Sequence, residues 1–199
     1  AGVRALAVAI ITFLGVAVVS ALRFAVFPLL VSIAVVISSI ARLFAADHVV
    51  KINETPIVFG SPDQIFELLS DFSSAASWDP GVIESRRMQP DEGQVRVGSK
   101  FALTTLWKGE RSEMTYTLLE IQRPSRIVLR GESNVSSAHD TIVLCPANGA
   151  NTQTAVDYTL EVQLKGWRKP FAAMIMEDLR KLGRAAMEGL EDACEQRFR

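Results

Sequence analysis

Residues 154–164, TAVDYTLEVQL, and residues 170–197, PFAAMIMEDLRKLGRAAMEGLEDACEQR, decide the fold of this chain. In the first stretch apolar residues alternate from Val156 to Val162, which predicts a β-strand with one buried face. In the second, apolar residues recur at helical spacing between charged ones, which predicts a long amphipathic helix. The apolar positions of this helix are Phe171, Met174, Ile175, Leu179, Leu182, Ala186, Leu190 and Ala193.

The segment before residue 154 contributes further strands and two short helices. Strands are expected at 49–59, 82–88, 99–107, 112–121, 126–132 and 138–144, and helices at 62–69 and 71–76. Ser61 and Gln64 form a capping-box pattern for the first helix, and Pro56 marks an edge or a bend in the first strand. This order predicts an α+β fold in which a curved antiparallel seven-stranded sheet wraps around the long C-terminal helix.

Several short segments carry a family resemblance. They are SPDQIF (61–66), WDPGV (78–82), VGSKF (97–101), TY followed by PSR (115–116 and 124–126) and LGRAAMEGL (182–190). Together they resemble the helix-grip (SRPBCC) superfamily, which includes START lipid-transfer domains, Bet v 1-type proteins and polyketide cyclase/dehydrase-like proteins. The resemblance covers residues 48–197 and implies a helix-grip fold with an internal cavity. It implies no single activity, because the superfamily contains binders, transporters, cyclases and hydrolases.

The N-terminal segment has a different composition. All 22 Asp and Glu residues lie after position 46, whereas only three of the 21 Lys and Arg residues lie before it. This asymmetry divides the chain into a transmembrane segment, 1–46, and a START-like ligand-binding domain, 47–199. The runs 5–22 and 24–41 each hold 18 residues without a charge, which is close to the minimum for a membrane span.

Three arrangements of this segment remain open. It could form a transmembrane helical hairpin, a single span beside an interfacial helix, or a signal peptide cleaved near Ser20 and followed by one span. In the hairpin, Arg4 and Arg42 flank one side and Arg23 the other. The positive-inside bias then predicts a membrane-anchored protein whose domain lies in the cytoplasm.

Composition excludes several other classes of protein. The domain holds 18 Lys and Arg against 22 Asp and Glu, so no basic surface for nucleic acid is expected. Two histidines and two cysteines without ligand spacing predict no metal site. The chain has no glycine-rich phosphate loop, and no cofactor is expected.

The candidate ligand site consists of the positions expected to face the interior of the sheet. These are Trp78, Phe101, Leu103, Trp107, Met114, Tyr116, Leu118, Asp140, Ile142, Tyr158, Leu160, Phe171, Met174 and Ile175. Most are apolar, which favours a hydrophobic small molecule such as a lipid, sterol, quinone or polyketide-like compound.

Asp140 is the only catalytic candidate. Its neighbour His139 points to the opposite face of the strand, so the two do not form a dyad. A carboxylate inside the cavity would have a raised pKa and could act as an acid or base. Alternatively, Asp140 is solvated at the strand's open end or pairs with an arginine. Tyr116 and Tyr158 either orient a ligand oxygen or belong to the core.

The loop at 166–170, GWRKP, joins an aromatic residue to two cations. That combination suits anionic lipid headgroups, although an ordinary solvated turn has the same composition. Taken together, the patterns predict a membrane-anchored protein that binds or transfers a hydrophobic ligand and is not an enzyme. The alternatives are a cyclase/dehydrase-type enzyme that uses Asp140, Tyr116 and Tyr158, and a structural adaptor whose interior is filled.

Overall fold

The computed structural model describes residues 26, 28–42, 44–45, 49–88, 93–107, 109–147 and 152–199. It divides into two compact units, Ala1–Ala46 and Asp47–Arg199. In the first unit residues 28–42 are helical, and their apolar side chains are exposed. Within the described ranges no helix has the length and apolar character needed to cross a membrane. Of the two predicted spans, 5–22 lies outside the described residues and 24–41 is described only from residue 26, without residue 27.

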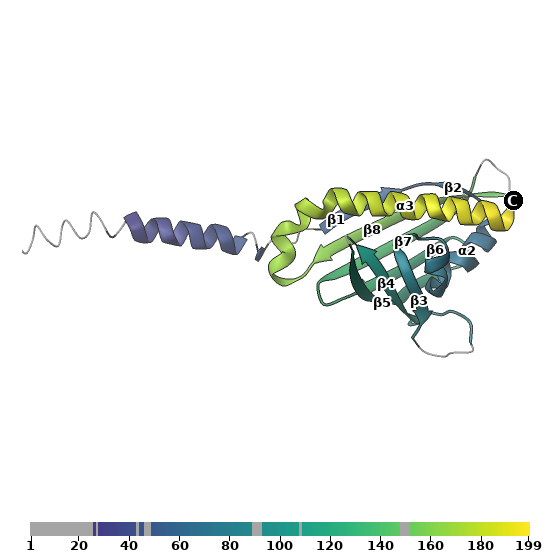
Figure 1. Ribbon diagram of the computed structural model, residues 1–199, viewed down its shortest axis with the longest axis horizontal. Helices are drawn as coiled ribbons and strands as arrows, with labels where there is room; N and C mark the ends of the chain where they lie inside the picture. Colours follow the sequence, from purple (N-terminus) through teal and green to yellow (C-terminus); the bar gives the residue numbers. More distant parts are fainter. Residues whose placement is uncertain are drawn as a thin grey trace, which may run out of the picture. The chain divides into compact units, whose positions relative to one another are not determined.

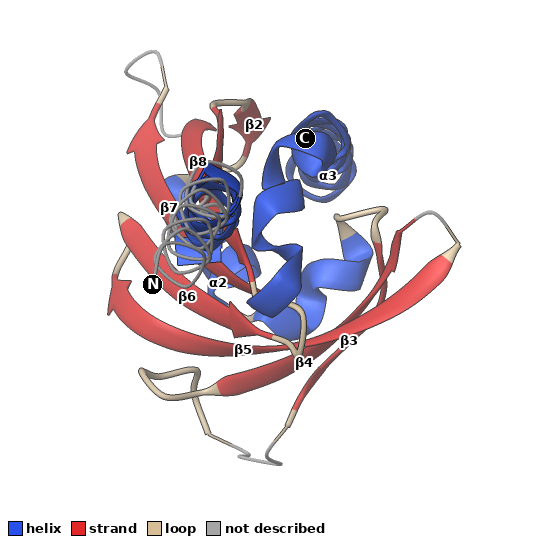
Figure 2. Ribbon diagram, turned by 90° about the vertical axis from the view of Figure 1, so that its left-hand side faces the viewer, coloured by secondary structure: helices blue, strands red, loops and turns tan. Residues whose placement is uncertain are grey.

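The second unit is an α+β domain. Its elements are β1 (Val49–Glu54), β2 (Ile57–Phe59), α2 (Pro62–Ser70), η1 (Phe72–Ser77), β3 (Val82–Arg87), β4 (Lys100–Trp107), β5 (Glu110–Gln122), β6 (Arg126–Glu132), β7 (Ser136–Pro146), β8 (Gln153–Leu164), η2 (Gly166–Phe171) and α3 (Ala172–Phe198). The antiparallel sheet has the order β1-β8-β7-β6-β5-β4-β3, and β2 also pairs with β8. Figures 1 and 2 show this sheet curving around the helices, as the helix-grip prediction requires.

The sheet has eight strands where seven were predicted, because the first predicted strand breaks at Pro56. Proline has no N–H for the ladder, and its ring fixes φ. The segments on either side become β1 and β2, and both pair with β8. The backbone N–H of Val156 still donates to the carbonyl of Pro56 (2.9 Å), so the chain stays on the sheet through the break.

The first helix begins as its sequence predicts. The Ser61 hydroxyl accepts the backbone N–H of Gln64, and the Gln64 side chain accepts the backbone N–H of Ser61 (2.8 Å), which completes the capping box. The segment predicted as a second helix is the 3₁₀ helix η1. Arg87 on β3 donates to Asp71 just before η1 (2.6 Å), which ties this helix to the edge of the sheet.

The two halves of α3 pack differently. Ala186, Met187, Leu190 and Cys194 are buried in the main core with α2, η1 and the sheet. In the first half, Ala172 is buried against Val50 and Ile52, whereas Met176 and Leu179 are only half-buried around this smaller cluster. Every residue of both clusters lies between 50 and 198, so the domain has a core of its own.

Glycine 189 allows the second half of α3 to approach the chain before β3. A Cβ at this position would collide with the backbone carbonyl oxygen of Trp78 and lie 3.0 Å from the Pro80 ring. The close contact between α3 and the turn at 78–80 therefore depends on the missing side chain.

The predicted register of the first turns of α3 is wrong. Residues 166–171 form η2, and α3 starts at Ala172. From that start the helical repeat places Ala172, Met176 and Leu179 against the sheet. Phe171 and Met174, predicted to face the interior, are exposed.

Candidate ligand-binding site

One row of side chains crosses the concave face of the sheet and contains a carboxylate. Asp140 on β7 lies between Leu129 on β6 and Leu160 on β8. The same row continues to Leu118 on β5 and to Ile52 on β1. A Cβ on Gly183 of α3 would lie 3.2 Å from Ile52, so this row faces the helix. Asp140 is therefore the single polar member of an aliphatic row beneath α3.

Asp140 is 1% exposed and has one hydrogen-bond partner among the described residues. The Tyr158 hydroxyl donates to its Oδ1 atom over 2.6 Å. The Oδ2 atom is buried and has no partner in the described part of the chain. Burying a polar atom without a hydrogen bond costs about 1–3 kcal/mol, so such atoms are rare. The exposed position of His139 on the opposite face agrees with the predicted alternation.

The buried position shifts the acidity of Asp140 strongly. Burial raises its pKa to about 7, although the hydrogen bond from Tyr158 acts in the opposite direction. The charge of Asp79 adds to the rise. Burial, together with these carboxylates, also raises the pKa of Tyr116 and of Tyr158 well above the usual tyrosine value. At neutral pH the site thus holds two neutral phenols and a carboxyl group that is close to the midpoint of its titration.

Asp79 is a further member of the site, and in the sequence it stood out only as part of the WDPGV segment that carries the family resemblance. Its side chain is half-buried, and its Oδ1 accepts the backbone N–H of Gly81 over 2.8 Å. Burial raises its pKa. No sequence periodicity governs a turn residue, so the only available signal was the acidic residue in WDPG.

An aromatic cluster closes one side of the site. The ring of Phe72 on η1 lies 5.3 Å from Tyr116, 6.1 Å from Trp78 and 6.3 Å from Phe101. The Trp78 Nε1–H donates to the hydroxyl of Ser74 over 3.3 Å, so this tryptophan is a satisfied core residue. Phe72 was not among the predicted lining residues, and it joins the three predicted aromatic residues Trp78, Phe101 and Tyr116.

The ring of Tyr116 crosses the neighbouring strand where that strand has no side chain. Gly131 on β6 lies opposite Tyr116, and a Cβ there would lie 2.9 Å from the tyrosine Cζ atom. It would also lie 2.5 Å from the Met114 sulfur. Gly131 therefore lets both side chains lie flat over β6.

The structure brings most of the predicted lining residues to this concave face. The fully or nearly fully buried ones are Trp78, Phe101, Leu103, Leu118, Asp140 and Ile142, and the half-buried ones are Met114, Tyr116, Tyr158 and Leu160. Ile175 on α3 is half-buried and belongs to neither core cluster. Trp107 ends β4, and its side chain lies outside the described part of the structure. Phe171 and Met174 are exposed and do not line the candidate site.

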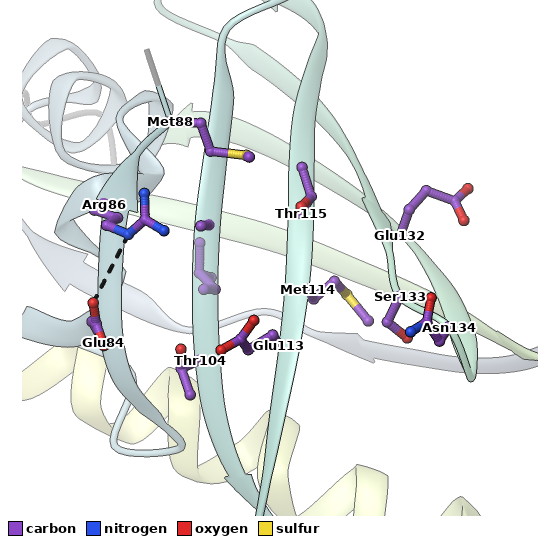
Figure 3. Close-up of a pocket in the computed structure, with 12 residues that line it drawn as sticks. Glu84, Arg86, Met88, Thr104, Glu113, Met114, Thr115, Glu132, Ser133 and Asn134 are labelled. Atoms are coloured by element: carbon purple, nitrogen blue, oxygen red, sulfur yellow. Dashed lines mark ion pairs between the residues drawn. The ribbon is translucent and has the colours of Figure 1, made fainter. Parts of the chain in front are cut away.

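Two hollows lie away from this row. The pocket in Figure 3, of about 330 Å³, is lined by polar residues such as Glu84, Arg86 and Glu113, and Glu84 pairs with Arg86 at 3.9 Å. Glu113 and Thr115 of β5 pair with Thr104 and Ala102 of β4, on the face opposite to Phe101 and Tyr116, so most of this pocket lies on the outer face, although Leu103 and Met114 also contribute to its wall. The other is an open groove of about 840 Å³ between the 78–80 turn and α3, and Asp79 lies in its wall.

The arrangement suits an oxygen-bearing apolar molecule. A carboxyl group with a pKa of about 7 can either donate or accept a hydrogen bond near neutral pH, and its Oδ2 atom is available. The surrounding aliphatic side chains offer only dispersion contacts. Within the described residues no group of three or more His, Cys, Asp and Glu side chains could hold a metal ion.

The curved antiparallel sheet and the long C-terminal helix fit the helix-grip fold, and comparison with known proteins agrees. The family model described as "Polyketide cyclase / dehydrase and lipid transport" matches residues 49–195. The chain belongs to this family. No curated protein sequence matches the chain.

Solved structures show the same fold at low sequence identity. A START superfamily protein from Mycobacterium smegmatis is 16% identical with a TM-score of 0.57, and the match covers 74% of this chain and 96% of that one. The Zhui aromatase/cyclase from Streptomyces sp. R1128 is 17% identical with a TM-score of 0.62, covering 76% and 97%. The di-domain ARO/CYC StfQ from the steffimycin biosynthetic pathway is 13% identical with a TM-score of 0.58, covering 75% and 52%.

Proposed function

We propose that the domain binds an apolar small molecule that carries a hydroxyl or carbonyl group. The molecule lies between the concave face of the sheet and the first half of α3, with its oxygen on Asp140. The observation that carries this proposal is the Oδ2 atom of Asp140, which has no hydrogen-bond partner among the described residues and lies in an otherwise aliphatic row. A ligand oxygen would supply the missing hydrogen bond, and the half-buried Leu160 and Met176 would gain contacts from its apolar body.

A pair of fluorescent probes tests this proposal. 1-Hydroxypyrene and pyrene differ by one hydroxyl group, and we expect the wild-type domain to bind the hydroxylated probe about tenfold more tightly, as one hydrogen bond to a partly charged group allows. Asp140→Leu should remove this preference and keep the affinity for pyrene. Binding is measured by fluorescence titration, and mass spectrometry of solvent extracts identifies any ligand that co-purifies.

The control is Asp157→Leu, which changes an exposed carboxylate on the outer face of β8. It should leave both affinities unchanged. An equal preference for 1-hydroxypyrene in the wild type and in Asp140→Leu would show that Asp140 does not hold the ligand oxygen.

One observation favours catalysis as a second candidate function. A carboxyl group with a pKa of about 7 is matched to proton transfer at neutral pH, and Tyr158 fixes its orientation. In this case the domain would act as a cyclase/dehydrase-type enzyme on the same ligand. Asp140→Asn should then abolish turnover of the extracted ligand while it still binds, and a rate equal to that of the wild type would remove Asp140 from the mechanism.

We also propose that residues 1–46 attach the domain to a membrane, with the domain on the cytoplasmic side. The exposed apolar side chains of the helix at 28–42 and the absence of any acidic residue before Asp47 support attachment. After expression in bacteria, the full chain should stay in the membrane pellet at high pH in carbonate, and residues 47–199 should be released. Release of both would contradict attachment.

A further inference from the structure

Three large apolar side chains are exposed together where β8 leads into α3. Trp167 is 63% exposed, Phe171 44% and Met174 75%, and we call these three residues the η2 tip. The 3₁₀ helix η2 has no buried residue and no side-chain cap at its start. Folding therefore leaves these side chains in solvent, which is costly unless another surface covers them.

The η2 tip is ordered by its own contacts. The Trp167 and Phe171 rings meet edge to face at 6.0 Å, and the Arg168 guanidinium lies 4.6 Å from the centre of the Trp167 ring. The apolar surface is thus presented with a cation directly against it. This is the arrangement that a lipid headgroup region favours, because it accepts both an aromatic ring and a positive charge.

The charge around the tip differs from that of the rest of the domain. Residues 162–176 contain Lys165, Arg168 and Lys169 and no acidic residue, whereas the domain as a whole has more acidic than basic residues. Lys165 pairs with Glu132 of β6 at 2.5 Å, so the cation that bears on the tip itself is Arg168. An anionic surface would therefore attract the tip through Arg168.

The η2 tip lies at the end of the sheet where the chain enters the domain. Val49, where the described chain enters the domain from the apolar N-terminal segment, pairs with Gln163 near the end of β8. The backbone N–H of Lys165, just before η2, donates to Val135 in the β6–β7 turn over 2.8 Å. The entry of the chain and the η2 tip thus lie at the same end of the sheet.

We propose that the η2 tip docks on an anionic lipid bilayer, with Trp167, Phe171 and Met174 in the interface and Arg168 against the headgroups. This inference goes beyond ligand binding and does not depend on Asp140. It gives the domain a membrane contact of its own, separate from residues 1–46.

Vesicle flotation of residues 47–199 tests the docking, since this unit has its own core and circular dichroism verifies its folding. We expect binding to vesicles of phosphatidylcholine with 30% phosphatidylglycerol, weaker binding to phosphatidylcholine alone, and release at high salt. Trp167→Ala with Phe171→Ala should weaken binding by at least about tenfold through lost apolar burial. Arg168→Gln should weaken it by about fivefold.

The matched control is Val97→Ala with Leu119→Ala, which truncates two apolar side chains that are 58% and 42% exposed elsewhere on the domain. This control should bind vesicles like the wild type. The proposal is overturned if the control and the tip variant lose binding equally, or if no vesicle binds the domain. It is also overturned if light scattering shows a dimer that the tip variant abolishes while vesicle binding stays unchanged, because the tip would then join two copies.

Discussion

Asp140→Asn is expected to raise the free energy of unfolding at pH 8 by as much as about 4 kcal/mol. The folded protein holds this carboxyl group at a pKa of about 7, whereas its ordinary value is 3.8, so ionisation in the folded state is costly above neutral pH. The asparagine amide stays neutral and can still accept the hydrogen bond from Tyr158. A buried charge is therefore removed without removing its partner.

The effect has a defined pH window. Because the pKa is raised on folding, the folded state binds the proton more tightly, and the contribution of Asp140 to stability is lost as the pH rises from about 4 to about 7. Urea unfolding at pH 5 and pH 8 should therefore show that the free energy of unfolding of the wild type falls between these two pH values. The fall should be much smaller for Asp140→Asn. A variant less stable than the wild type at pH 8 would contradict the raised pKa.

Asp71→Asn is the matched control, because the pKa of Asp71 is lowered in the folded protein whereas that of Asp140 is raised. Burial alone would raise the pKa of Asp71, but the hydrogen bonds from Arg87 and Ser73 lower it overall. Its stabilising contribution is present above the ordinary pKa and is lost as the pH falls. Asp71→Asn should accordingly destabilise the protein at pH 8, where Asp140→Asn stabilises it.

Gly189→Ala is expected to lower the free energy of unfolding by about 2–3 kcal/mol. A helical glycine replaced by alanine ordinarily gains up to about 1 kcal/mol. Here the new Cβ would collide with the backbone carbonyl oxygen of Trp78, which cannot rotate away as a side chain would. Relief requires α3 to shift from the 78–80 turn, and overpacking of this kind costs about 1–3 kcal/mol or more. Urea unfolding measures the change.

Gly183→Ala in the same helix serves as the comparison. Its Cβ would meet only a methyl group of Ile52, at 3.2 Å, and a side chain at that distance can adjust. We expect a change of less than about 1 kcal/mol. If both alanine variants are equally stable, the contact with Trp78 does not limit the position of α3.

Much of the fold followed from periodicity alone. The alternation from Val156 to Val162 defines which side chains of β8 face the core, and the same rule placed Asp140 inside and His139 outside. These predictions succeeded because a strand's two faces depend only on odd and even positions. The neighbour of Asp140 was not predictable: Tyr158, rather than an arginine, is its partner.

Other features depend on information that a local pattern lacks. A helix register shifts when the first helical residue moves, and the unforeseen η2 moved it enough to expose Phe171 and Met174. The charge of Asp79 acts on Asp140 although Asp79 lies in a turn, and a turn has no periodic face from which its position could be predicted. The role of Gly189 depends on how closely two distant segments approach, and this distance appears only once the chain is folded.

The uneven packing of α3 has a consequence for the kinetics of ligand exchange. The second half of the helix is part of the main core, whereas the first half rests on a smaller cluster whose Met176 and Leu179 remain half-buried. Local opening of the first half would cost only the contacts of that cluster and leave the rest folded. The rates of ligand entry and release can thus be set by the fraying of one helix end, independently of the global unfolding rate.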